Sequence, residues 1–95
     1  MLYDEFVTTL EDINPPKITE NLLSLWFDAK GNWDKAHEIV QDDNSRDAAW
    51  IHAYLHRKEG DLSNASYWYS RIGRARSQKT LDEEWDELAN YLLSK

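Results

Sequence analysis

The sequence predicts an all-α fold in which two antiparallel helical hairpins of the same design are flanked by one further helix at each end. Residues 22–40 align with residues 51–69, and this alignment places Gly31 on Gly60, 29 positions later. Apolar residues also recur at the spacing of a helix, and the chain lacks the regular alternation of a strand. Repeated units of this kind cannot bury their apolar faces alone, so we expect the two hairpins to stack.

The glycine of each repeat marks the turn of a hairpin. A helix often ends with glycine in the left-handed conformation just after its last turn. The residue that follows each glycine, Asn32 or Asp61, can cap the next helix by accepting a hydrogen bond from its first free amides. An alanine five positions after each glycine is small enough to let the two helices of a hairpin approach closely.

The N-terminal helix is expected within residues 1–13, which carry a one-sided apolar stripe. The stripe consists of Leu2, Tyr3, Phe6, Val7, Leu10 and Ile13. Pro15 and Pro16 then forbid continuation of the helix. The first hairpin occupies residues 18–43 and the second residues 47–73. The first helix of each hairpin is apolar on more than one side, which predicts that it lies between two neighbours.

The C-terminal helix is expected at residues 80–94. Thr80 followed by Glu83 matches a capping box, in which each side chain bonds the other residue's backbone amide. The apolar stripe of this helix consists of Leu81, Trp85, Leu88 and Leu92. We expect it to cover the open face of the second hairpin. At 95 residues, the whole chain is then one domain.

Residues 31–36 and 60–65 resemble the glycine-x-aromatic-x-x-alanine turn of tetratricopeptide repeats, although Leu62 replaces the aromatic residue in the second copy. Residues 49–61 also resemble a segment of small bacterial proteins with no assigned function. The period is shorter than the 34 residues usual in the tetratricopeptide family. The resemblance implies a groove, lined by the first helix of each hairpin, that binds a peptide or a partner helix.

Carrying the groove positions of that family onto this chain selects seven residues. They are Asn21, Leu25, Asp28, Trp50, Tyr54, Arg57 and Lys58. Helical spacing independently places 50, 54 and 57 on one face, and tryptophan, tyrosine and arginine dominate the energetics of interfaces. The sequence therefore favours a protein-binding or scaffolding module. The alternative is that Trp50 and Tyr54 pack beneath a terminal helix while Arg57 pairs with a carboxylate such as Asp28.

The three histidines allow a different function. His52 and His56 are four positions apart, and His37 lies on the second helix of the first hairpin. Together with a carboxylate, Glu38 or Glu59, they could ligate zinc or a similar divalent ion. The alternatives are that these histidines make structural polar contacts or act as a general acid or base.

Composition limits the remaining functions. Cysteine is absent and the net charge is −7, so thiol chemistry is excluded and phosphate backbones are repelled. Residues 71–79 are basic, but we expect them to pair with the acidic residues 82–87 instead of binding nucleic acid. No secretion signal, membrane-spanning segment or cofactor motif is visible. We therefore expect a cytoplasmic monomer or homodimer without enzymatic activity and without a cofactor, unless the histidines hold a metal.

Overall fold

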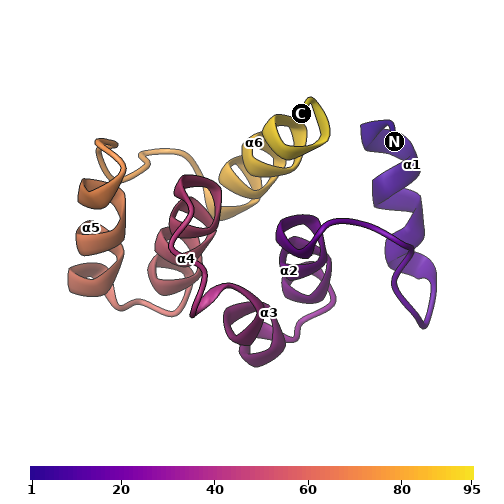
Figure 1. The fold of residues 1–95 in the computed structure, drawn as a ribbon, viewed down its shortest axis with the longest axis horizontal. Coiled ribbons are helices and arrows are strands. Elements are labelled where there is room, and N and C mark those ends of the chain that lie inside the picture. The colour runs from indigo at the N-terminus through magenta and orange to yellow at the C-terminus, as the bar shows by residue number, and fades with distance from the viewer.

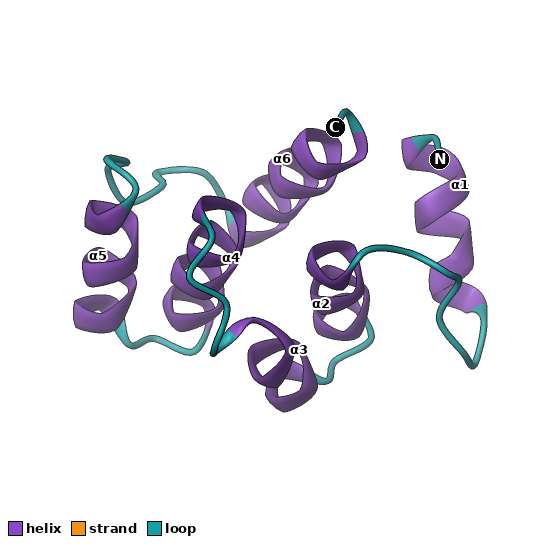
Figure 2. Cartoon of the chain, viewed as in Figure 1, coloured by secondary structure: helices purple, strands orange, loops and turns teal.

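The structure is a computed structural model that describes residues 1–95, and it contains helices but no strand (Figure 2). The prediction of an all-helical fold is confirmed. The α-helices are α1 (Tyr3–Thr8), α2 (Glu20–Ala29), α3 (Trp33–Val40), α4 (Arg46–Lys58), α5 (Leu62–Arg71) and α6 (Leu81–Leu93), and a 3₁₀ helix (Thr9–Glu11) follows α1. None of them combines the length and the apolar character that a membrane crossing requires.

The turns that join α2 to α3 and α4 to α5 have the same hydrogen bonds. Gly31 has a φ of 83° and Gly60 a φ of 88°, both in the left-handed region. The amide after each glycine donates back across the turn, from Asn32 to the Phe27 carbonyl at 2.9 Å and from Asp61 to the His56 carbonyl at 2.9 Å. Each turn therefore ends one helix in a Schellman motif.

The residue that completes each turn also begins the next helix. The Asn32 side chain accepts a hydrogen bond from the Lys35 amide at 3.1 Å, and the Asp61 side chain accepts one from the Asn64 amide at 3.3 Å. One residue thus ties the end of a helix, through its backbone amide, to the start of the next, through its side chain, which explains how three residues suffice for each connection.

Replacing Gly60 with alanine should lower the free energy of unfolding by about 1–2 kcal/mol, because a Cβ disfavours the left-handed conformation. A Cβ at this position meets no atom within 4 Å, so the loss comes from the backbone alone. Urea unfolding followed by circular dichroism measures it. Gly60→Asn should lose less, since asparagine tolerates this conformation. Equal stability of the wild-type and alanine proteins would contradict this account of the turn.

The helices are arranged as two pairs, with α2 packed on α3 and α4 packed on α5, and α6 lies across α2 and α4 (Figure 1). The sequence predicted that the last helix would cover the second hairpin, but it contacts both. The Trp85 indole of α6 donates to the Leu25 carbonyl of α2 at 3.1 Å. The Phe6 ring of α1 stacks on the Trp85 ring, and the two ring centres are 5.9 Å apart.

The core contains two buried carboxylates, each held by side chains from other helices. Glu84 of α6 is 1% exposed. It accepts hydrogen bonds from the Trp50 indole at 3.1 Å, the Tyr69 hydroxyl at 2.6 Å and the Arg57 guanidinium at 2.8 Å. Asp28 of α2 accepts from the Tyr54 hydroxyl and the Lys58 ammonium group, both at 2.9 Å. Burial is tolerated because each charge is paired and hydrogen-bonded.

Candidate functional site

The residues predicted to line a groove lie between α2, α4 and α6. Leu25, Asp28, Trp50 and Tyr54 are buried, Asn21 and Arg57 are half-buried, and Lys58 is exposed. Helix α6 covers Trp50 through the Glu84 hydrogen bond, and the Tyr91 ring lies 5.4 Å from the Trp50 ring. Arg57 pairs with Glu84, whereas Asp28 pairs with Lys58. Trp50 and Tyr54 thus pack beneath the last helix, as in the packing alternative.

The three histidines of the chain converge at the junction between α3 and α4. Each of them offers one ring nitrogen to a cluster in which the three nitrogens lie within 4.8 Å of one another. The Nε2 atoms of His37 and His52 are 3.0 Å apart. The rings of His52 and His56 are 4.8 Å apart and nearly parallel. Two helices from different hairpins therefore supply every histidine that the protein has.

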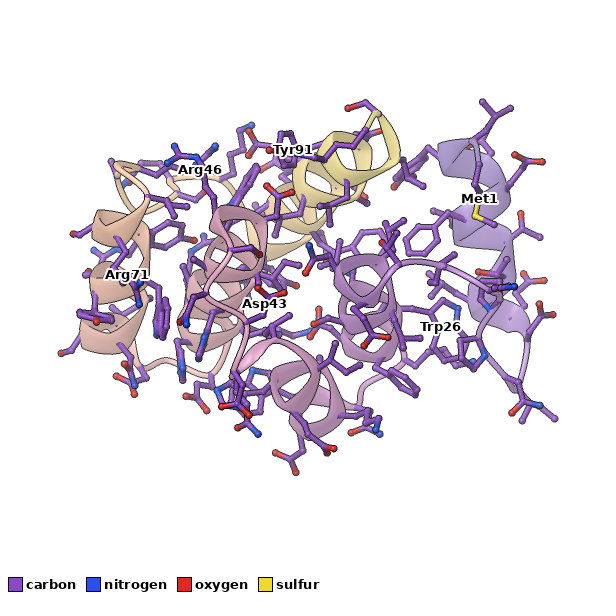
Figure 3. All side chains as sticks on the ribbon, in the orientation of Figure 1. Met1, Trp26, Asp43, Arg46, Arg71 and Tyr91 are labelled. Atoms are coloured by element: carbon purple, nitrogen blue, oxygen red, sulfur yellow. The ribbon has the colours of Figure 1, made fainter.

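Two tryptophans hold this His37–His52–His56 cluster in place. The Trp33 ring stacks on His37 at 4.9 Å, and the Trp68 ring stacks on His52 at 4.1 Å. The Trp33 indole donates to the Leu55 carbonyl of α4 at 2.8 Å, which fixes its orientation. Arg71, labelled on α5 in Figure 3, lies over the Trp68 ring at 5.0 Å. The sequence alone does not place Trp33 or Trp68 at the site, because only the packing of α3 and α5 against α4 brings them there.

Burial favours the neutral forms of His37 and His52. His52 is 5% exposed and His56 7%. Desolvation, together with the neighbouring His37 and His56, lowers the pKa of His52 to about 4. Desolvation and His56 also lower the pKa of His37, more than the nearby Glu59 and Asp34 raise it. At neutral pH His37 and His52 are therefore neutral imidazoles, which is the form that binds metals.

One nitrogen of the cluster has no partner. The Nδ1 atom of His52 is buried and makes no hydrogen bond. An unsatisfied buried polar atom costs about 1–3 kcal/mol, and an apolar side chain of similar size would avoid this cost. The Nε2 atom of the same ring contacts Nε2 of His37 at 3.0 Å, so His52 directs one nitrogen to the other histidines and leaves the other nitrogen without a partner.

The carboxylates near the cluster differ in their roles. Glu59 lies 2.8 Å from the Nδ1 atom of His56, which orients that ring and leaves its Nε2 atom as the available ligand. Glu38 is exposed and lies 3.7 Å from Lys35, so it does not take part. His56 and Glu59 also form a second possible group with Asp61, but that group is mostly exposed and contains a single histidine.

In the absence of metal, the protein should lose stability as the pH falls from 6.5 to 4. Because the pKa of His52 is lowered to about 4 in the folded state, the unfolded chain binds a proton in this range that the folded chain does not. The expected loss is on the order of 3 kcal/mol. Urea unfolding of chelator-treated protein at several pH values measures it, with His52→Gln as the control for the titration of carboxylates. The same pH slope in both proteins would contradict the prediction.

The basic segment after α5 pairs within the protein. Arg74 and Lys79 lie 3.6 Å and 3.2 Å from Glu87 of α6, and the Arg74 guanidinium lies 3.7 Å from the centre of the Trp50 ring. For Arg74 and Lys79, this arrangement agrees with the expected pairing to the acidic residues 82–87 of the last helix. The segment thus helps to hold α6 in place.

Comparisons with protein-family models, with curated proteins and with solved structures find no match for this chain. Three imidazoles from two helices, one of them tied to a carboxylate, can bind a metal ion with room for a further ligand.

Proposed function

We propose that this protein binds one divalent transition-metal ion through His37, His52 and His56, and that the ion links the first hairpin to the second. The observation that carries the proposal is the convergence of the only three histidines of the chain, from two helices, within 4.8 Å. Histidines placed by chance along a surface would be spread over several helices and loops.

The spacing of the nitrogens suits a small ion. Three nitrogens bound to one tetrahedral zinc at about 2.0–2.1 Å lie about 3.4 Å from one another. The His37 and His52 nitrogens are already 3.0 Å apart, and the remaining distances of the cluster are at most 4.8 Å. Rotations of the three rings would bring these distances to the values that the ion requires. Glu59 then serves as the outer partner that holds the tautomer of His56.

The donor set selects the kind of metal. Imidazole nitrogens favour Zn²⁺, Co²⁺, Ni²⁺ and Cu²⁺, whereas Mg²⁺ and Ca²⁺ require oxygen ligands. We infer that the ion acts on the stability of the junction between α3 and α4. The rings of Trp33 and Trp68 flank two of the ligands, and the one cavity of the protein lies elsewhere.

The proposal is tested with untagged protein that has been treated with a chelator and then titrated with Zn²⁺ in a calorimeter. We expect one ion per chain in the wild type and at least about 100-fold weaker binding after His37→Ala, since a lost ligand costs more than a lost outer-shell partner, worth 10–100-fold. His37 is half-buried, so this variant should still fold, which circular dichroism verifies.

Two matched variants distinguish metal binding by the three histidines from binding that involves Glu38 or Asp61. Glu38→Gln changes the exposed neighbour of His37 and should leave binding unchanged. Asp61→Asn should also have no effect, and asparagine retains the cap at the start of α5. Binding that survives His37→Ala, or that is lost in Asp61→Asn, would contradict the proposed ligand set and would point to the group of His56, Glu59 and Asp61.

We also propose that the two hairpins form a short tetratricopeptide-like array. The identical hydrogen bonds of the Gly31 and Gly60 turns support this proposal, as does the complete burial of Ala36 and Ala65 at equivalent positions. In this array α6 occupies much of the face where longer arrays would present a groove. A crystal structure in which α2–α3 fails to superimpose on α4–α5 would exclude it.

A further inference from the structure

A cavity of about 470 Å³ lies between α2, α4 and α6. It is the part of the predicted groove that α6 leaves open, since Asp28, Tyr54 and Lys58 contribute to its lining. Residues two positions apart on a helix point about 200° away from each other. Tyr54 therefore faces away from His52 and His56, and the cavity is separate from the histidine cluster.

One wall of the cavity is a fixed polar network. Asp28 and Tyr54 are each 2% exposed, and both oxygens of the Asp28 carboxylate are occupied, one by the Tyr54 hydroxyl and one by the Lys58 ammonium group. The charges of Asp28 and Lys58 balance each other. This wall is thus preorganised and close to neutral.

The α6 side of the cavity carries negative charge without a counter-ion. Asp82 and Asp86 of α6 are exposed and one helical turn apart, and neither forms an ion pair with a lysine, arginine or histidine. Asp86 accepts a hydrogen bond from the Tyr3 hydroxyl. Like charges at this spacing repel each other, so a cation placed between them would be stabilised.

An aromatic side chain lines the cavity together with these two carboxylates. Trp85 lines the cavity, and its indole nitrogen is fixed by the Leu25 carbonyl at 3.1 Å. A tryptophan ring attracts cations and also packs against alkyl chains. The cavity thus combines an apolar surface with a few converging polar groups, as binding sites for small ligands do.

We propose that this cavity binds an alkyl cation, that is, an ammonium or guanidinium group on a short apolar stem. The cation lies between Asp82 and Asp86, and the stem packs on Trp85. Three carboxylates and one ammonium group line the cavity, and the chain carries a net charge of −7, so an anion is repelled. The ligand is either a free amine or the side chain of a lysine or arginine in a peptide.

The test uses chelator-treated protein, so that its result does not depend on the metal proposal. Titration with n-butylamine at pH 7 is followed by the five tryptophan indole signals in a proton–nitrogen NMR spectrum. We expect a saturable shift of the Trp85 signal while the Trp33 and Trp68 signals stay in place. 1-Butanol, which has the same stem without the charge, should bind at least about tenfold more weakly.

Two double variants test the role of the carboxylates. Asp82→Asn with Asp86→Asn should weaken binding of n-butylamine at least about tenfold, and asparagine at 86 can still accept from Tyr3. Glu38→Gln with Asp42→Asn removes two negative charges outside the cavity lining and should leave the affinity unchanged. Equal weakening in both variants, equal binding of the alcohol, or an unmoved Trp85 signal would overturn the proposal.

A blocked tripeptide, acetyl-Gly-Lys-Gly-amide, distinguishes the two sources of the cation. Binding at least as tight as that of n-butylamine assigns the cavity to basic side chains of a peptide. Shifts with n-butylamine but not with the tripeptide assign it to free amines. Both results uphold an alkyl cation as the ligand, whereas absence of binding by either probe contradicts it.

Discussion

Replacing Glu84 with leucine should lower the free energy of unfolding by about 3–5 kcal/mol, a large part of the about 5–10 kcal/mol expected for a domain of this size. Glu84 is 1% exposed and accepts hydrogen bonds from Trp50, Tyr69 and Arg57. Without it, the Arg57 charge and two buried donors lose their partner. Burial and the hydrogen bond to Glu84 also raise the pKa of Tyr69, which shows how closely the two groups are coupled. Urea unfolding measures the loss.

Two further variants assign this effect to the buried pair. Glu87→Gln, on the same helix, removes a partly exposed carboxylate that pairs with Arg74 and Lys79, and it should cost less than about 1 kcal/mol. Adding Arg57→Met to Glu84→Leu removes the unpaired charge and should restore part of the stability. A loss below 1 kcal/mol for Glu84→Leu would mean that this network does not hold α6 on the second hairpin.

Zinc should stabilise the metal-free protein strongly. A ligand that binds only the folded state adds about 2.7 kcal/mol at a concentration of 100 times its dissociation constant. For a domain of about 100 residues, this corresponds to an increase of more than about 10 °C in the melting temperature. The physical reason is that the ion joins α3 to α4 through His37, His52 and His56, three ligands that the unfolded chain does not hold together. Thermal unfolding with and without Zn²⁺ measures the shift.

The controls for this prediction distinguish zinc binding at the histidine cluster from nonspecific zinc binding to an acidic protein. Mg²⁺ at the same concentration should have little effect, because the site offers no set of oxygen ligands. His52→Gln should abolish most of the zinc-induced shift, while Glu38→Gln should retain it. An equal shift in the wild type and in His52→Gln would show that zinc binds outside the cluster.

Much of the fold could be predicted from short-range signals. Glycine with a positive φ at positions 31 and 60, the Asn32 and Asp61 caps, and the capping box of Thr80 and Glu83 each depend on neighbouring residues alone. Such patterns survive whatever the tertiary arrangement is, which is why the element order agrees with the prediction. The first helix is the exception in detail, because it changes to a 3₁₀ helix at Thr9–Glu11.

The site depended on long-range packing and could be predicted only in part. The spacing of His52 and His56 placed both on one face of a helix, but whether His37 reaches them depends on how α3 packs on α4. The sequence also did not predict the pairs of the buried network. It suggested Asp28 as a partner of Arg57, but Arg57 binds Glu84, which lies 27 positions later. The cavity depends on the packing of α6 across both hairpins, and the sequence predicted for Asp82 and Asp86 a pairing with the basic segment, which neither of them forms.

X-ray absorption spectroscopy of the zinc-loaded, untagged protein tests the central claim most directly, because it counts the ligands of the ion. The account predicts three imidazole nitrogens at about 2.0–2.1 Å and a fourth light ligand. Since the chain has three histidines and no cysteine, this result would assign His37, His52 and His56 together. Coordination of the zinc by oxygen atoms with at most one imidazole nitrogen would contradict the proposed histidine site.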